Sequence, residues 1–273
     1  MILVVASSKD VASVNIAKQI LSHFEFEKTM ESFQETPVYT AEVAALEVKL
    51  ITLTGESIYA QYLTDVFAPE LIVFISRHSS ASGTPTLSVH TPGNLSEAKI
   101  GGIPRKVSVS PANVMRDALK AMRRLKEELN LDYEVSYEAT HHGPSLNVPA
   151  MFTEVGSSLK QWRDLKAAEA VACATMEAIS KFTRPQTAAV LGIGGPHYNR
   201  KFTRMALEGE TAFGHMIPKY AISSVDRGIL KHCVERTLEE VEFAVLDWKG
   251  IKGEHKSKLI AMLNEIDLSV KKV

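Results

Sequence analysis

The chain has 273 residues, of which 45% are hydrophobic and 23% are charged, and this composition excludes a mainly disordered protein. Its 31 lysines and arginines nearly balance its 32 aspartates and glutamates, which excludes binding to polyanions through net charge alone. No apolar run approaches the ~20 residues of a membrane-spanning helix, and the first residues lack the features of a signal peptide. We therefore expect a cytoplasmic protein with no membrane partner, and the sequence indicates no stable protein partner.

Short runs rich in β-branched residues alternate along the chain with segments of helical periodicity. The expected strands are, in chain order, residues 1–7, 48–54, 71–78, 85–91, 133–140, 187–195 and 243–248. The expected helices are one capped by Asp10, one that begins at Ser110-Pro111 with the serine as N-cap, and three more at about 159–182, 226–241 and 255–266. This alternation predicts an α/β fold with a mostly parallel or mixed central sheet flanked by helices. No repeat or linker interrupts it, so we expect a single domain over residues 1–273.

Histidines follow several of these strands. His78, His90 and His197 each lie where an apolar run gives way to Gly, Pro or Ser, and His141-His142 follow the strand at 133–140. Because ligands of open α/β sheets bind at the carboxyl ends of strands, we expect these histidines to face one pocket. Adjacent residues on a strand point to opposite faces, so both His141 and His142 can face that pocket only if Gly143 bends the chain. The alternative is that one of the pair only packs locally.

Histidines without matching cysteines point to nitrogen and oxygen ligation of a metal. Cys173 and Cys233 show no CxxC spacing and are interpreted as small buried hydrophobic residues. Glu138 and Glu154 supply carboxylates near the histidine pair. Such a donor set suits a zinc ion that keeps one position open for water, although the spacing is not HExxH. The expected ligands are a subset of His78, His141, His142, His215 and Glu154, with His142 first. Without a metal, the histidines could act as a general base or an oxyanion partner.

The segment GIGGPHYNRKF at 192–202 is a glycine-rich turn between a strand and a basic stretch. Backbone N–H groups at Gly194 and Gly195, with Arg200 and Lys201 nearby, would suit a phosphate or an oxyanion. The segment matches neither GxGxxG nor a P-loop, so a tight turn that serves only packing stays an equal alternative.

Basic residues also gather locally, at Arg105-Lys106, within 116–126, at Arg200, Lys201 and Arg204, and within 249–258. These groups are either solvated helix faces or sites that bind a phosphate backbone.

Four motifs occur in a fixed order along the chain: SRHSSASGTPTLSVHTPGN, EATHHGPS, GIGGPHY and FGHMIPKY. Together they resemble the archaeal- and plant-type D-aminoacyl-tRNA deacylases, a zinc-dependent family also called D-tyrosyl-tRNA deacylases, over essentially the whole chain. The resemblance implies a fold related to peptidyl-tRNA hydrolases and nucleoside phosphorylases, Zn²⁺ as cofactor and D-aminoacyl-tRNA as partner. It implies hydrolysis of the ester between a D-amino acid and tRNA by a zinc-activated water. The expected catalytic residues are His78, His141, His142 and His197.

Two other classes stay open. A nucleosidase or phosphorylase would hold phosphate with Arg77 and the glycine-rich turn and would stack a nucleobase on Tyr198. An RNA-binding module without catalysis would explain the basic groups but leave the histidines without a role. The expected substrate-binding residues are Arg77, Gly194, Gly195, Tyr198, Arg200 and Lys201.

Overall fold

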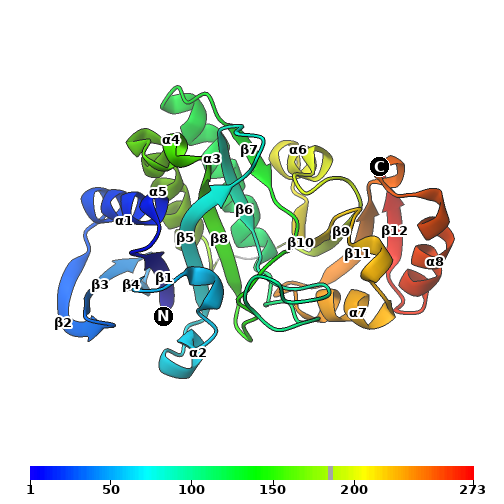
Figure 1. Cartoon of the computed structure of the whole chain (residues 1–273), viewed down its shortest axis with the longest axis horizontal. Coiled ribbons are helices and arrows are strands. Elements are labelled where there is room, and N and C mark those ends of the chain that lie inside the picture. The colour runs from blue at the N-terminus through cyan, green and yellow to red at the C-terminus, as the bar shows by residue number, and fades with distance from the viewer. Residues whose placement is uncertain (184–186) are drawn as a thin grey trace.

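The strands form two sheets in the computed structural model, which describes residues 1–183 and 187–273 (Figure 1). The larger sheet contains, in spatial order, β2 (Glu27–Phe33), β3 (Thr36–Val43), β4 (Leu46–Leu53), β1 (Ile2–Ser7), β5 (Leu71–Ser79), β8 (Ala150–Ser157), β6 (Thr86–His90) and β7 (Glu134–Tyr137). The smaller sheet contains β10 (Ala212–Ile217), β9 (Ala189–Ile193), β11 (Val241–Leu246) and β12 (Ser269–Lys272), all parallel. In the larger sheet β4, β1, β5 and β8 are parallel, whereas β2–β3 is a hairpin and β6 runs antiparallel to β8.

Helices cover the sheets on the sides that carry apolar residues. They are α1 (Val11–His23), α2 (Leu63–Val66), α3 (Ala112–Glu128), α4 (Leu159–Trp162), α5 (Leu165–Ser180), α6 (Arg200–Glu208), α7 (Arg227–Glu235) and α8 (Gly253–Asn264), with 3₁₀ turns η1 (Ser57–Tyr59), η2 (Ile222–Ser224) and η3 (Trp248–Gly250). Helix α5 contacts both α1 and α3, and all three helices contact central strands of the larger sheet. Helix α3 also packs on β10, so it joins the two sheets.

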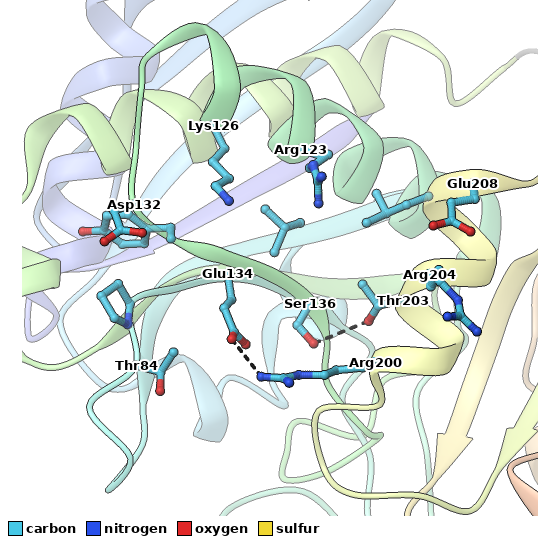
Figure 2. A pocket seen from close by; sticks show the side chains of 14 residues that line it. Thr84, Arg123, Lys126, Asp132, Glu134, Ser136, Arg200, Thr203, Arg204 and Glu208 are labelled. Atoms are coloured by element: carbon cyan, nitrogen blue, oxygen red, sulfur yellow. Dashed lines mark hydrogen bonds and ion pairs between the residues drawn. The ribbon is translucent and has the colours of Figure 1, made fainter.

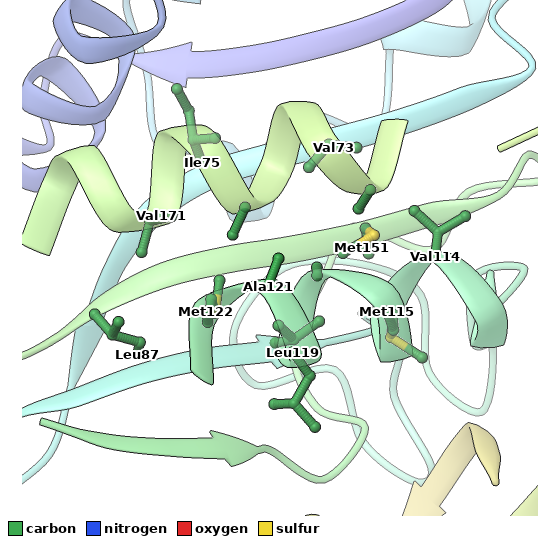
Figure 3. Close-up of a cluster of buried hydrophobic side chains, with 14 of the residues drawn as sticks. Val73, Ile75, Leu87, Val114, Met115, Leu119, Ala121, Met122, Met151 and Val171 are labelled. Atoms are coloured by element: carbon green, nitrogen blue, oxygen red, sulfur yellow. The ribbon is translucent and has the colours of Figure 1, made fainter. Parts of the chain in front are cut away.

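The period of two along each central strand gives the sheet two faces, of which one is apolar and the other changes from apolar to polar along the strands. Val73 and Ile75 of β5, Leu87 of β6 and Met151 of β8 point toward α3 and α5 and form a dry core (Figure 3). The alternate residues point to the opposite face, where Phe74 and Phe152 stack with their ring centroids 4.7 Å apart. Continuing by twos along this second face leads from Phe74 to Ser76 and His78, from Phe152 to Glu154, and from Ser88 to His90. The strand period therefore places polar side chains from three strands on one surface.

The α/β prediction with a mixed central sheet is confirmed. The expected strands are present except that residues 138–140 lie beyond the end of β7. Asp10 caps α1 as expected, since its carboxylate accepts a hydrogen bond of 3.0 Å from the Ser13 N–H. The sequence patterns do not predict the β2–β3 hairpin or the strands β8, β10 and β12.

Three helix predictions need correction. The helix expected over 226–241 ends at Glu235, and Val241 already begins β11. Ser110 is not the N-cap of α3, because the Glu239 carboxylate accepts hydrogen bonds from the Ala112 and Asn113 N–H groups at the first turn. The helix expected over 159–182 is broken into α4 and α5, and Asp164 caps the second piece. In the described part of the chain, no helix is long and apolar enough to cross a membrane. One hydrophobic cluster contains residues of both sheets, such as Val73 and Phe213. The two sheets thus share part of their core, and the single domain expected over residues 1–273 stays a prediction.

Candidate active site at the junction of the two sheets

The segment that follows β7 joins the larger sheet to the smaller one. The Ala139 N–H donates to the His197 carbonyl and the Thr140 N–H donates to the Met216 carbonyl, each at 2.9 Å. The Met216 N–H donates in return to the Thr140 hydroxyl at 3.1 Å. Residues 138–142 are thus held between the polar face of the larger sheet and the carboxyl ends of β9 and β10.

The histidines predicted to converge do so at this junction. The ring centroids of His141 lie 4.3 Å from His90, 4.2 Å from His142 and 4.5 Å from His197. His78 belongs to the same cluster through Glu138, which contacts both His78 and His197. The expected clustering is thus seen, whereas the expectation that all five histidines face one pocket is not borne out: His141 and His142 line one cavity and His197 lines another.

The prediction of a common carboxyl edge is wrong for β6. That strand runs antiparallel to β8, so its last residue, His90, pairs with Phe152 rather than with the end of β8. The two rings stack at 5.0 Å with an interplanar angle of 5°. The cluster therefore lies over the face of β8. There the carboxyl end of β6 meets the carboxyl end of β5, which runs in the opposite direction.

Both His141 and His142 reach the cluster because the strand has already ended at Tyr137. His142 adopts a positive φ of 42°, so the alternation of a strand does not apply to this pair. Each ring uses Nδ1 for a backbone carbonyl at 2.7 Å, that of Ala139 for His141 and that of Gly143 for His142. These bonds leave Nε2 of each ring as the nitrogen with a free lone pair.

Glu138 is the centre of the other half of the cluster. Its side chain is fully buried, and Oε2 lies 3.0 Å from Nε2 of His197. Oε1 lies 3.1 Å from Nδ1 of His78, which is close enough for an ion pair. The ring N–H does not point at Oε1, so this oxygen accepts no hydrogen bond among the described residues. The far nitrogens of both histidines are held by tyrosine hydroxyls, His78 by Tyr198 at 2.8 Å and His197 by Tyr220 at 3.0 Å.

The two buried carboxyl groups have pKa values pushed in opposite directions. Burial by itself raises the pKa of Glu138, but His197 and His78 oppose it and hold the pKa well below the usual range. Burial and the neighbouring Glu138 charge raise the pKa of Glu154 well above its usual range. The Glu154 carboxyl shares a hydrogen bond of 2.5 Å with the Ser76 hydroxyl. Because the two pKa values are shifted in opposite directions, the proton of the pair is assigned to Glu154 and the negative charge to Glu138.

Three overlapping sets of side chains could hold a metal ion, with all ligand atoms of a set within 4.8 Å of one another. They are His90, His141 and His142; Glu138, His141 and His197; and His78, Glu138 and Glu154. The all-histidine set fits a metal best. Both ring nitrogens of His90 are buried without a hydrogen-bond partner, and burial is the main cause that lowers the pKa values of all three rings. Neutral rings with free lone pairs are the form in which histidine binds a metal.

His215 does not join the cluster, contrary to its place among the expected ligands. Its Nδ1 lies 3.2 Å from the Thr140 hydroxyl and its Nε2 lies 3.1 Å from the Arg236 carbonyl. Both nitrogens are therefore used to hold the junction together. His215 positions Thr140, one residue before His141, and no ring nitrogen is left for a ligand.

The expected substrate-binding residues are mostly engaged with the protein. Arg77 pairs with Glu56 at 3.2 Å. Tyr198 is bonded to His78 rather than presenting its hydroxyl to solvent. Lys201 contacts Asp247 at 2.5 Å and the carbonyl of Val273.

The glycine-rich turn serves packing in this structure. Gly194 and Gly195 have φ values of 104° and 73°, and a Cβ at either would meet Ile251, Asp247 or Asn199 at 3.0 Å or less. The Gly194 N–H also donates to the Ile217 carbonyl, so it cannot bind an oxyanion, and that expectation is wrong for this residue.

A cavity of about 620 Å³ (the basic cavity), lined by four basic and three acidic side chains, lies beside the site rather than at it (Figure 2). Arg123 and Lys126 of α3 and Arg200 of α6 point into it, and Arg204 also lines it. Arg200 pairs with Glu134 at 2.8 Å, where β7 forms part of the wall. Ser136 of the same strand lines the cavity, two residues before Glu138. At about 3.3 Å per residue the cavity and the cluster are thus only on the order of 7 Å apart along β7.

Two further cavities reach the histidines directly. A cavity of about 560 Å³ is lined by His141 and His142, and one of about 110 Å³ is lined by His142 and Glu154. His142 therefore forms a wall shared by both.

Two residues that organise the site escape prediction from the sequence. The sequence indicates Glu138 only as a carboxylate near the histidine pair, and it does not single out Tyr220. Signals exist for both: Glu138 stands three residues before the histidine pair, and Tyr220 closes the FGHMIPKY motif. Neither signal reveals which side chains meet, because His197 and His78 come from different sheets.

The chain is similar to several known proteins. The family model for D-aminoacyl-tRNA deacylase matches residues 66–271. A Pyrococcus abyssi protein named D-aminoacyl-tRNA deacylase is 36% identical over 97% of each chain, and one of the same name from Methanosarcina acetivorans is 34% identical over 99% of this chain and 92% of its own. The solved structure of AF0625, a conserved protein of unknown function, aligns with a TM-score of 0.88 at 30% identity over 100% of this chain and 95% of its own.

The structural role of His215 generates a pH prediction. Burial lowers its pKa from 6.5 to about 3, so between these pH values the unfolded chain binds a proton that the folded chain does not. Stability from this residue is therefore complete above pH 6.5 and is lost as the pH falls. We expect the free energy of unfolding to fall between pH 7 and pH 5 by about 2 kcal/mol more in the natural protein than in His215→Gln. Urea unfolding at both pH values measures it, and equal losses in the two proteins would contradict the assignment.

Proposed function

Because the chain belongs to the D-aminoacyl-tRNA deacylase family, we propose that it hydrolyses the ester bond between a D-amino acid and tRNA, acting as a zinc enzyme in the cytoplasm, where aminoacyl-tRNA is used. The observation that carries the proposal is geometric: two buried carboxyl groups, Glu138 and Glu154, lie beside three histidines whose ring nitrogens are within 4.8 Å of one another. Ester hydrolysis needs a proton acceptor, a proton donor and an electrophile in one place, and this cluster offers all three.

The residues that would hold zinc are His90, His141 and His142. Two of them have their tautomer fixed by a carbonyl. The nitrogens of His90 have no hydrogen-bond partner among the described residues, and its Nδ1 lies 3.9 Å from a Glu154 oxygen. When bound, zinc supplies a Lewis acid that polarises a carbonyl oxygen and makes water more acidic. Of the ligands expected from the sequence, this set keeps His141 and His142. It adds His90 and leaves out His78, His215 and Glu154.

Glu138 is the proposed general base. Its Oε1 is buried and has no formal hydrogen bond, so it can accept the proton of the attacking water as the oxygen adds to the ester carbonyl carbon. His197 and His78 fix the carboxylate from both sides and keep it ionised.

Glu154 is the proposed proton donor. Burial and the neighbouring Glu138 charge raise its pKa and so favour its protonated form. When the bond between the carbonyl carbon and the ribose oxygen breaks, that proton passes to the leaving oxygen. The products are a free D-amino acid and tRNA. The proton that Glu138 took from water then passes to Glu154, which returns both carboxyl groups to their starting state.

A nucleosidase is less well supported. It would need Arg77 for phosphate and Tyr198 for the base, yet Arg77 pairs with Glu56 and Tyr198 is bonded to His78. A solved putative methylthioadenosine nucleosidase from Weissella paramesenteroides aligns with a TM-score of only 0.43 at 8% identity, which is too weak a likeness to carry an argument.

Purified protein should hydrolyse D-aminoacyl-tRNA faster than L-aminoacyl-tRNA and should lose this activity to a zinc chelator. The His90→Ala variant should lose bound zinc together with the activity, because it removes one of three ligands. Metal content measured by mass spectrometry on never-chelated protein provides a readout that is independent of turnover.

The matched control for this experiment is His23→Ala, which removes a partly exposed histidine at the end of α1. It should keep both metal and activity. Active protein that contains no zinc would reject the metal proposal, and hydrolysis without preference for the D-form would reject the substrate.

The basic cavity next to the site is the proposed binding surface for the tRNA phosphates. Removing charge at Arg200 and Arg204 together should raise the KM for aminoacyl-tRNA and reduce the log–log salt slope by about 0.7 to 0.9 for each phosphate that is no longer neutralised. Hydrolysis of a D-aminoacyl-adenosine ester, which has no phosphate backbone, should barely change. Steady-state kinetics over a series of salt concentrations measure both quantities.

Arg227→Ala with Lys231→Ala is the matched control, because this pair lines a different cavity between α7 and α8. An unchanged salt slope in the Arg200 and Arg204 variant would show that these cations are a solvated face.

A further inference from the structure

The cavity of about 560 Å³ is open to the histidine cluster along one wall. His141 and His142 line it, and both belong to the set that could hold a metal. A molecule bound in this cavity therefore has one edge next to the rings of His141 and His142. Its size falls within the range of sites that enclose a small molecule, about 300–1,000 Å³.

The opposite wall is a loop that hydrogen bonds hold against the site. The Gly143 N–H donates to the Ile100 carbonyl at 2.9 Å, and the Gly93 N–H donates to the His142 carbonyl at 2.7 Å. Gly102 at φ 77° lets the loop approach Gly143 to a distance that a side chain would prevent. The cavity is therefore preformed, which lowers the entropic cost of binding.

The lining has the chemistry of a nucleotide site. Tyr220 is 61% exposed, with its ring plane within 18° of His197 behind it, so an aromatic face is open to the cavity. Ile100 is 53% exposed and adds an apolar surface. Lys99 also lines the cavity, and its pairing with Glu97 at 3.4 Å is a solvent-exposed ion pair that a phosphate can replace.

We propose that this cavity binds the 3′-terminal nucleotide of the substrate, with the base stacked on Tyr220 and its 5′-phosphate at Lys99. The proposal rests on the proposed function, and it names where the RNA end of the ester lies. A nucleoside seated on Tyr220 turns its ribose toward His141 and His142, where the ester bond is cut.

The neighbouring cavity favours the same assignment. At about 110 Å³ it is far too small for a nucleoside. Three carboxyl groups, those of Asp10, Glu56 and Glu154, line it together with the cation of Arg77. The larger cavity carries only Glu97 and Lys99 as carboxylate and ammonium groups. Size therefore directs the nucleotide to the Tyr220 side of His142 and leaves the other side for the aminoacyl group.

The test is calorimetric titration of the whole protein with adenosine and with 5′-AMP, neither of which can be hydrolysed as an ester substrate. Tyr220→Leu should weaken the binding of both by about 5- to 150-fold, as expected for the loss of one stacked base. Tyr220→Trp keeps an aromatic face and should bind both probes nearly as well as the natural protein. Lys99→Ala should weaken AMP but not adenosine, because only AMP has a phosphate.

Tyr62→Leu and Lys231→Ala are the matched controls, since neither residue lines this cavity, and both should bind AMP normally. Failure of AMP to bind at millimolar concentration, or equal binding by Tyr220→Leu and the natural protein, would overturn the proposal. Deacylation of D-aminoacyl-tRNA is measured in parallel. Activity without Tyr220-dependent AMP binding would reject only the nucleotide site, and Tyr220-dependent binding without activity would reject only the proposed function.

Discussion

The structure of the site depends on keeping one fully buried carboxylate, that of Glu138, ionised. Glu138 is fully buried, and a buried charge is tolerated only when other groups compensate it. His197 and His78 provide that compensation from opposite sides, and Tyr220 and Tyr198 fix the two rings in turn. His78 comes from the larger sheet and His197 follows a strand of the smaller one, so the charge on Glu138 is stable only where the two sheets meet.

The same constraint explains the division of labour between the carboxyl groups. With Glu138 ionised, a second negative charge on Glu154 is unfavourable, and Glu154 keeps its proton. Burial of His90, His141 and His142 keeps these rings neutral. A base, an acid and a set of metal-binding nitrogens thus arise from one buried network, without any group that must be charged and unpaired.

The sequence predicts the ingredients of this site better than their arrangement. Strand ends marked by Gly, Pro or Ser locate His78, His90, His141 and His142 correctly, because apolar runs identify the strands. The reversed direction of β6 has no local signal, since it depends on pairing with β8, a strand that the sequence patterns do not predict. His215 resembles the other histidines in sequence, and only its bonds to Thr140 and Arg236 show that it holds the junction. Long-range pairing and tautomers are tertiary properties, so periodicity cannot supply them.

The most direct test of the account is the Glu138→Gln variant, which keeps the shape of the side chain and removes its negative charge. The account predicts that kcat for D-aminoacyl-tRNA falls by about 10²- to 10⁴-fold, the usual contribution of a general base, while the zinc content stays that of the natural protein. A variant that retains the natural kcat, or that loses activity only because it has lost its zinc, would contradict the assignment of Glu138 as the base.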